Sequence, residues 1–144
     1  KNGLRIYLEK RIRSKYYVRG SFSKLFRQYY QYGYWKVFVN KKHKTVTTIR
    51  QLIPLFFVCF LLFGGGLVAL FPLLFIYYIS IFLSYIFFAF FFALKKSKSV
   101  KTMFLIAFTF FELHLSYGLG YLVGIIEFLL LGKKPNEKSK SLSR

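Results

Sequence analysis

The feature that most constrains this chain is a run of 43 residues, 52–94, without a charged side chain. A bilayer core about 30 Å thick is crossed by about 20 apolar helical residues, so this run is long enough for two crossings. Three glycines at residues 64–66 loosen the helix, and Pro72 is suited to begin a new one. We therefore predict a hairpin of two transmembrane helices, at about 52–71 and 72–94. The alternative, a buried helix of a soluble protein, rarely exceeds about 25 residues.

The composition also indicates a membrane protein. Hydrophobic residues make up 56% of the chain and aromatic residues 23%, which is more than a soluble domain of 144 residues can bury. Of the 23 Lys and Arg residues, fourteen lie in residues 1–50, four in 95–101 and five in 133–144. Such blocks can bind nucleic acid. Beside membrane segments, however, they orient the protein and contact anionic lipids. We expect anionic lipids as partners and no nucleic acid.

A third apolar stretch, residues 103–131, contains polar groups. Glu112 and His114 are ionisable, and such groups are costly inside a membrane, so we expect them to face protein or water. They could contact a proton or a substrate, or they could form polar links between helices. Ser116, Gly120 and Gly124 recur every four residues and so predict a face for close helix packing.

The basic blocks predict the orientation of a multi-pass protein of the cell membrane. The positive-inside rule places residues 1–50 and 95–101 in the cytoplasm. The third stretch is too long for one untilted crossing and too short for two. We therefore expect it to bend near residues 116–120 and to return a disordered, basic tail, residues 133–144, to the cytoplasmic side.

The region before the hairpin divides into two parts. Alternating apolar and polar residues in 1–20 predict two short strands. Two strands are not stable alone, so we expect them to end a domain that precedes this chain. Ser21 is a suitable N-cap for an amphipathic helix, which with a basic linker fills residues 21–50. We expect this helix to lie in the plane of the membrane surface.

One segment of that helix, residues 28–36 (QYYQYGYWK), combines amides, tyrosines and the only Trp in the chain. A sugar ring can stack on an aromatic side chain while amides bind its hydroxyls, although the same residues can form an aromatic belt at the membrane surface. No catalytic set is complete, because the chain has no Asp and its Ser, His and Glu residues do not form a triad. The lone Cys59 provides neither a disulfide nor a zinc pattern.

Three stretches carry a resemblance to a known family: KNGLRIYLEKRIRSKYY, RGSFSKLFRQYYQYGYWKV and HLSYGLGYLVG. With the hydrophobic run between them, they resemble the C-terminal part of bacterial membrane-bound family 2 glycosyltransferases. The relatives of exopolysaccharide synthesis, of the succinoglycan glucosyltransferase type, look most similar. The resemblance covers residues 1 to about 131, and it implies that residues 1–20 are the end of a GT-A catalytic domain.

The resemblance implies an inverting transferase that moves a sugar from a nucleotide-sugar to a lipid-linked or polysaccharide acceptor. In that family the cytoplasmic GT-A domain holds a divalent metal, Mg or Mn, through a DxD motif, and an Asp acts as general base. Both motifs would precede Lys1, so the catalytic residues and metal ligands are expected outside this chain, which alone would be inactive.

The resemblance also implies acceptor-binding residues within the chain. Gln31, Tyr34 and Trp35 are similar to the QxxRW motif of processive members, whose Gln and Trp contact the acceptor sugar. Tyr34 replaces the Arg of that motif, which leaves processivity open. The fold class expected is a mainly α-helical integral membrane protein with a short β-strand remnant, an amphipathic surface helix and two to three transmembrane helices. The alternative function is a non-enzymatic polytopic membrane protein, such as a transporter or an assembly subunit.

Overall fold

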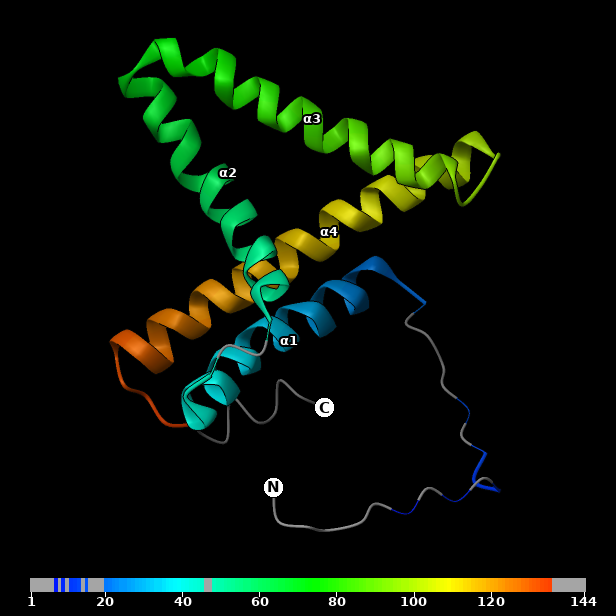
Figure 1. The fold of residues 1–144 in the computed structure, drawn as a ribbon, viewed down its shortest axis with the longest axis vertical. Helices are drawn as coiled ribbons and strands as arrows, with labels where there is room; N and C mark the ends of the chain where they lie inside the picture. The colour runs from blue at the N-terminus through cyan, green and yellow to red at the C-terminus, as the bar shows by residue number, and fades with distance from the viewer. Residues whose placement is uncertain are drawn as a thin grey trace.

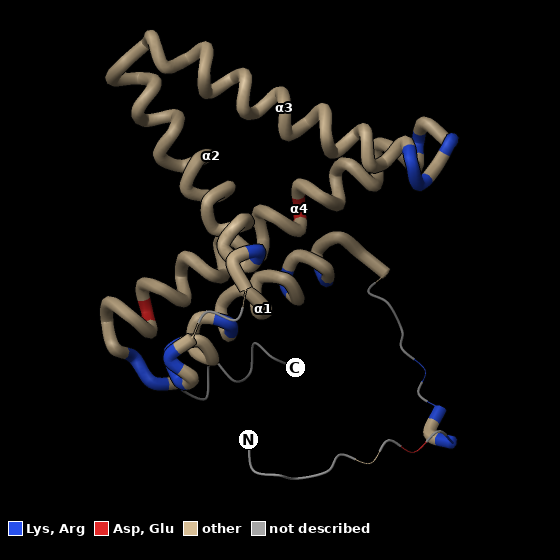
Figure 2. The backbone as a smooth tube through the Cα atoms, in the orientation of Figure 1, with Lys and Arg blue, Asp and Glu red and all other residues tan. Residues whose placement is uncertain are grey.

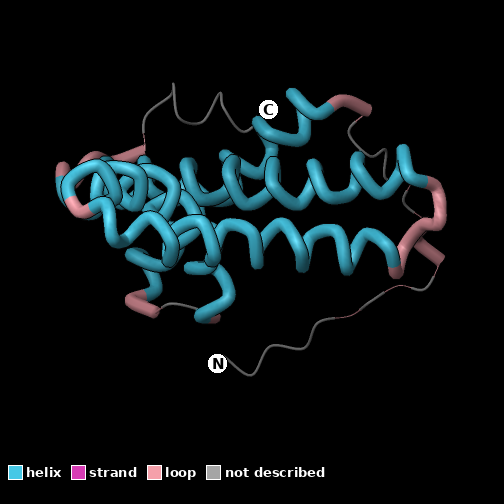
Figure 3. Tube along the Cα trace, turned by 90° about the horizontal axis from the view of Figure 1, so that it is seen from above, coloured by secondary structure: helices cyan, strands magenta, loops and turns pink. Residues whose placement is uncertain are grey.

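The chain is helical throughout most of the part that the structure describes. This computed structural model describes residues 20–45 and 48–135, together with positions 7, 9, 11–13 and 15. No strand occurs among these residues (Figure 3). In chain order the elements are α1 (Phe22–His43), η1 (Ile49–Leu52), α2 (Ile53–Leu70), η2 (Pro72–Leu74), α3 (Phe75–Leu94), α4 (Val100–Gly124) and η3 (Ile125–Leu130).

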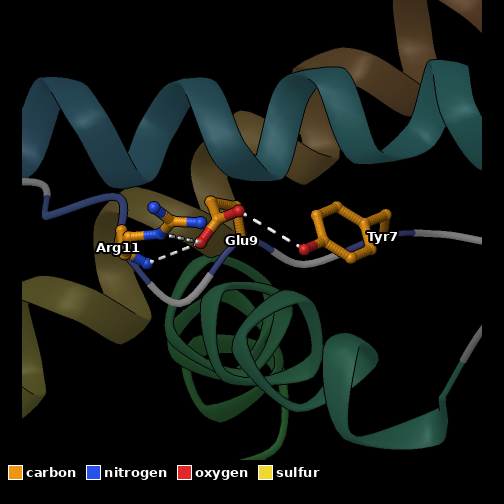
Figure 4. A network of polar contacts seen from close by, with 3 residues as sticks. All are labelled: Tyr7, Glu9 and Arg11. Atoms are coloured by element: carbon orange, nitrogen blue, oxygen red, sulfur yellow. Dashed lines mark hydrogen bonds and ion pairs between the residues drawn. The ribbon is translucent and has the colours of Figure 1, made fainter.

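The two strands predicted in residues 1–20 fall mostly on positions outside the described residues. Within this region the structure describes a turn, in which the Ile12 backbone N–H donates to the Glu9 carbonyl over 3.4 Å. The Glu9 carboxylate accepts hydrogen bonds from the Tyr7 hydroxyl (3.3 Å) and from Nε of Arg11 (3.2 Å), as Figure 4 shows. An exposed ion pair of this kind contributes little stability. The β-strand remnant stays a prediction.

Helices α2 and α3 form the predicted apolar hairpin. α2 continues through its three glycines and ends at Phe71, whose φ of −130° and ψ of 84° are not helical. Pro72 then begins the short turn η2 that leads into α3, because proline fits the first turn of a helix. The helical segments Ile49–Leu70 and Pro72–Leu94 lie close to the predicted boundaries, and both are long and apolar enough to cross a membrane.

The third apolar stretch is a single long helical segment, Val100–Leu130, which is also long and apolar enough to cross a membrane. Three such helices indicate a multi-pass membrane protein. The bend predicted at residues 116–120 is wrong, because α4 is α-helical up to Gly124 and its only irregularity is the π-helical turn η3. Gly118 and Gly120 do not break the helix, since each lies against the backbone of another helix, at Pro54 and Tyr30 respectively.

Helix α1 begins where the sequence predicts. The Ser21 hydroxyl accepts a hydrogen bond from the Lys24 backbone N–H at 3.4 Å, which caps the first turn. Lys44 ends the helix in the left-handed conformation, with φ of 52°. Lys41, Lys42 and His43 in the last turn lie near the negative end of the helix dipole.

The helices are arranged as a triangle with a fourth helix alongside (Figure 1). α2 and α3 diverge from their shared turn, and the first half of α4 closes the triangle. α1 lies beside the second half of α4, and both helices run in the same direction. Phe22 packs edge-on against Phe108 at 5.1 Å near one end, and the Lys41 ammonium donates to the Phe128 carbonyl near the other.

Candidate functional site

The α1–α4 interface is the most extensive helix contact in the described part of the chain, and glycines allow its close approach. A Cβ on Gly33 would overlap the Tyr117 carbonyl of α4, and a Cβ on Gly120 would overlap the Tyr30 carbonyl of α1. On Gly124, a Cβ would lie 2.8 Å from the Tyr34 carbonyl oxygen. Ser116 is fully buried, and Gly120 and Gly124 are buried as well. The predicted small-residue face is therefore confirmed, and its partner is α1.

Polar side chains join the two helices near their C-terminal ends. The Tyr34 hydroxyl donates to Oε2 of Glu127 at 2.6 Å, and the Lys133 ammonium lies 3.2 Å from the other carboxylate oxygen. Nδ2 of Asn40 donates to the Tyr121 hydroxyl at 3.1 Å. A carboxylate that is shared by a phenol and an ammonium is a strong link, since hydrogen bonds to charged groups exceed neutral ones in strength.

Two of the three predicted acceptor-binding residues take part in this packing. Tyr34 is 5% exposed, and burial, followed by its hydrogen bond to Glu127, raises the pKa of its phenol. Trp35 is half-buried, with its ring 6.1 Å from those of Phe38 and Phe128. Its indole N–H is buried and has no hydrogen-bond partner within the described residues. A buried donor without an acceptor is unusual and indicates a partner outside this part of the chain.

Gln31, the third predicted residue, lies one helical turn before Tyr34 and Trp35 on the same side of α1. It is half-buried and makes no side-chain hydrogen bond to any residue that the structure describes. Gln28, one turn earlier, differs from it, because Nε2 of Gln28 donates to the Tyr32 hydroxyl at 2.6 Å. The Gln31 amide is thus one polar group of this segment that has no partner among the described residues and can bind a ligand.

Glu112 and His114 of α4 both face protein. Glu112 is 7% exposed, and its carboxyl lies next to the backbone of Phe26 in α1. Nδ1 of His114 lies 2.8 Å from the Phe110 carbonyl and 3.3 Å from the Tyr85 hydroxyl of α3. Glu112 is therefore buried against protein, and half-buried His114 links two helices as a polar contact. The expectation that both groups avoid lipid stays a prediction.

Besides a hollow of about 150 Å³ beside Tyr29 and His114, two hollows border the ends of α1, and none of the three is lined by the predicted acceptor-binding residues. One, of about 370 Å³, lies at the start of the helix beside Ser21 and Thr109. The other, of about 230 Å³, lies at its end, and its lining residues are Val37, Asn40, Lys41, Lys44, Thr45, Tyr121 and Leu129. The second hollow combines an apolar floor with ammonium groups, a combination suited to an anionic amphiphile.

The described residues do not provide a metal centre, since they contain no group of three His, Cys, Asp or Glu side chains that could hold an ion. Sequence reasoning missed the roles of Asn40, Tyr121 and Glu127 in the interface. The four-residue spacing of Gly120 and Gly124 marked the face of α4 that packs against α1. This spacing was the signal in the sequence from which the nearby Tyr121 and Glu127 could have been assigned to the interface.

Removal of the Tyr34 hydroxyl should weaken the α1–α4 interface. We expect Tyr34→Phe to lower the free energy of unfolding by about 2 kcal/mol, because a hydrogen bond to a charged group is lost. Thermal unfolding in detergent measures this. The pKa of Tyr34 is raised on folding, so its contribution is complete below about pH 10 and declines as the pH rises towards the folded pKa. As the pH rises above 10, the free energy of unfolding should therefore fall less steeply for Tyr34→Phe than for the wild type.

Tyr32→Phe is the matched control for this experiment. Its hydroxyl also takes part in a hydrogen bond, as the acceptor from Gln28, but the side chain is 52% exposed and its partner lies on the same helix. We expect a change within about 0.5 kcal/mol. Equal losses in the two variants would contradict the role given to the contact between Tyr34 and Glu127.

Comparison with known proteins does not assign the chain to a family. No family model, no curated protein and no solved structure matches it.

Proposed function

We propose that this chain is the membrane-anchoring and acceptor-positioning part of an inverting family 2 glycosyltransferase. The observation that carries the proposal is the placement of the QYYQYGYWK segment. It lies on a helix that is packed tightly against α4, beside an apolar hairpin suited to a bilayer. An enzyme that acts on a lipid-linked sugar must hold its acceptor site at a constant height above the membrane, and this packing supplies such a support.

Each predicted residue has a defined part in this proposal. Gln31 binds an acceptor hydroxyl through its amide, and half-buried Trp35 supplies the exposed part of its ring as an aromatic surface. Tyr34 is a positioning residue, because its hydroxyl holds α1 against Glu127. The basic residues of 1–50 and 95–101 support a cytoplasmic position for these groups, next to anionic lipids.

The reaction itself requires groups outside this chain. A nucleotide-sugar donor, an Asp general base and a divalent metal, Mg or Mn, belong to the GT-A domain that the resemblance implies. The described residues do not fit a metal ion, so we assign no step through it here. The acceptor hydroxyl held by Gln31 would attack the anomeric carbon, with inversion, as the nucleoside diphosphate leaves.

The test uses the full-length protein in native membranes, supplied in turn with radiolabelled nucleotide-sugars. We expect Gln31→Ala to lower transfer to the lipid acceptor about tenfold, which corresponds to the loss of one hydrogen bond of about 1.4 kcal/mol. Hydrolysis of the donor by water should be unchanged, because it does not involve the acceptor. Gln28→Ala is the matched control and should leave both rates unchanged, because that amide already binds Tyr32.

Two outcomes would count against the proposal. An equal loss of transfer and hydrolysis in Gln31→Ala would show that Gln31 is structural. If the wild-type protein transferred no sugar from any nucleotide-sugar, the transferase would be ruled out in favour of a non-enzymatic membrane protein.

A further inference from the structure

Helices α1 and α4 must lie at the same depth relative to a bilayer, because they are in contact from Phe108 to Phe128. α1 has 22 residues and is therefore about 33 Å long. It carries Arg27 and Lys36 on either side of its midpoint, and Arg27 is exposed. If α4 crossed the bilayer along this contact, both cations would enter the hydrocarbon. Each would then lose its hydration without gaining an opposite charge, which makes such a crossing costly.

The corners of the triangle differ in charge in a way that also disfavours a crossing by α4. Lys residues gather where α3 meets α4, within residues 95–101, and further Lys residues gather where α1 and η3 end, as Figure 2 shows. The corner between α2 and α3 has none, and Leu73 at this corner is 89% exposed. Both ends of α4 are therefore basic, whereas the α2–α3 corner is apolar. A crossing α4 would separate the two basic groups.

On α4 the polar side chains are turned towards protein and the exposed side chains beyond Thr102 are apolar, so its exposed side can lie in the outer hydrocarbon while α1 faces the headgroups. Its polar residues Glu112 and Ser116 are buried against protein. Phe104 is more than half exposed, as is Leu130 beyond its end, so both can enter the outer hydrocarbon. The start of α2 also lies at α4, where Pro54 contacts Gly118, and this places the entry of the hairpin at the level of α4.

From this geometry we propose that α1 and α4 lie side by side along one face of the bilayer, against anionic headgroups. Only the α2–α3 hairpin then enters the hydrocarbon. The loop at residues 95–101 and the segment after η3 share the face occupied by α1, without any bend in α4. This inference concerns placement alone and does not depend on the proposed transferase activity.

Accessibility of single cysteines tests the placement in the full-length protein. In a Cys59→Ala background, Ser23→Cys reports on α1, Ser99→Cys on the loop and Leu131→Cys on the end of η3, and all three native side chains are exposed. None of these substitutions changes the net charge. A membrane-impermeant maleimide is applied to right-side-out and to inverted vesicles, and detergent then reveals the total reactive thiol.

We expect all three cysteines to be labelled in the same vesicle preparation and to be protected in the other until detergent is added. Labelling of Ser99→Cys and Leu131→Cys from opposite sides would overturn the proposal, because it would show that α4 crosses. Protection of either site in both preparations would also overturn it, since an in-plane α4 leaves both ends at the aqueous surface. A variant that is not found in the membrane fraction is replaced by Lys98→Cys or Gly132→Cys, which report on the same two ends.

Discussion

Gly120→Ala is expected to separate α1 from α4 and to lower the free energy of unfolding by about 3 kcal/mol, the upper part of the range for overpacking. The added Cβ would overlap the Tyr30 carbonyl oxygen and lie 2.8 Å from its carbonyl carbon. These are backbone atoms within a helix, so a side-chain rotation cannot relieve the clash. Thermal unfolding in detergent, followed by fluorescence of the only tryptophan, Trp35, measures the loss.

Gly66→Ala provides the matched control within the same chain. A Cβ at Gly66 meets no atom within 4 Å, and the residue lies inside α2. Alanine is the better helix former by about 0.5–1 kcal/mol, so this variant should be as stable as the wild type or slightly more stable. If Gly120→Ala were equally well tolerated, the close approach of α1 and α4 would be wrong.

The sequence predicted the hairpin well, because its signal is local. The length of the uncharged run predicts two crossings, and the proline at its centre predicts the position of the turn. The prediction of a bend in the third stretch was wrong because a glycine can either interrupt a helix or allow another helix to pack closely against it. Gly120 permits a close approach to another helix, and no local pattern distinguishes this role from a break in the helix.

The partner of α1 could not be predicted for a related reason. Helical spacing showed which side of α1 is apolar, but an apolar side can face lipid or protein equally well. The hydrogen bond between Tyr34 and Glu127 spans 93 residues, and no spacing rule connects residues so far apart. Gln31, Tyr34 and Trp35 were predicted from their resemblance to a family motif. The structure adds that Tyr34 is committed to the α1–α4 interface, whereas the Gln31 amide is free among the described residues.

Phe128→Ala should produce the other large effect, a loss of about 3–5 kcal/mol in the free energy of unfolding. Phe128 is 1% exposed, and its ring lies 4.8 Å from that of Tyr34 and 5.3 Å from that of Phe38. Its removal leaves a cavity bounded by rigid aromatic rings, which cannot collapse to fill the space. Trp35 also borders this ring, so its emission should shift to longer wavelength as water enters.

Phe88→Ala separates this packing effect from a general loss of hydrophobic surface. Phe88 is 55% exposed, and among the described aromatic rings its ring packs edge-on against that of its neighbour Phe87 alone. In detergent or lipid its truncation exchanges one apolar contact for another, so unfolding should be nearly unchanged and the Trp35 emission constant. If Phe128→Ala lowered the free energy of unfolding as little as Phe88→Ala, Phe128 would contact lipid in the folded protein. The α1–α4 interface would then lack the aromatic core that fixes the QYYQYGYWK segment in place.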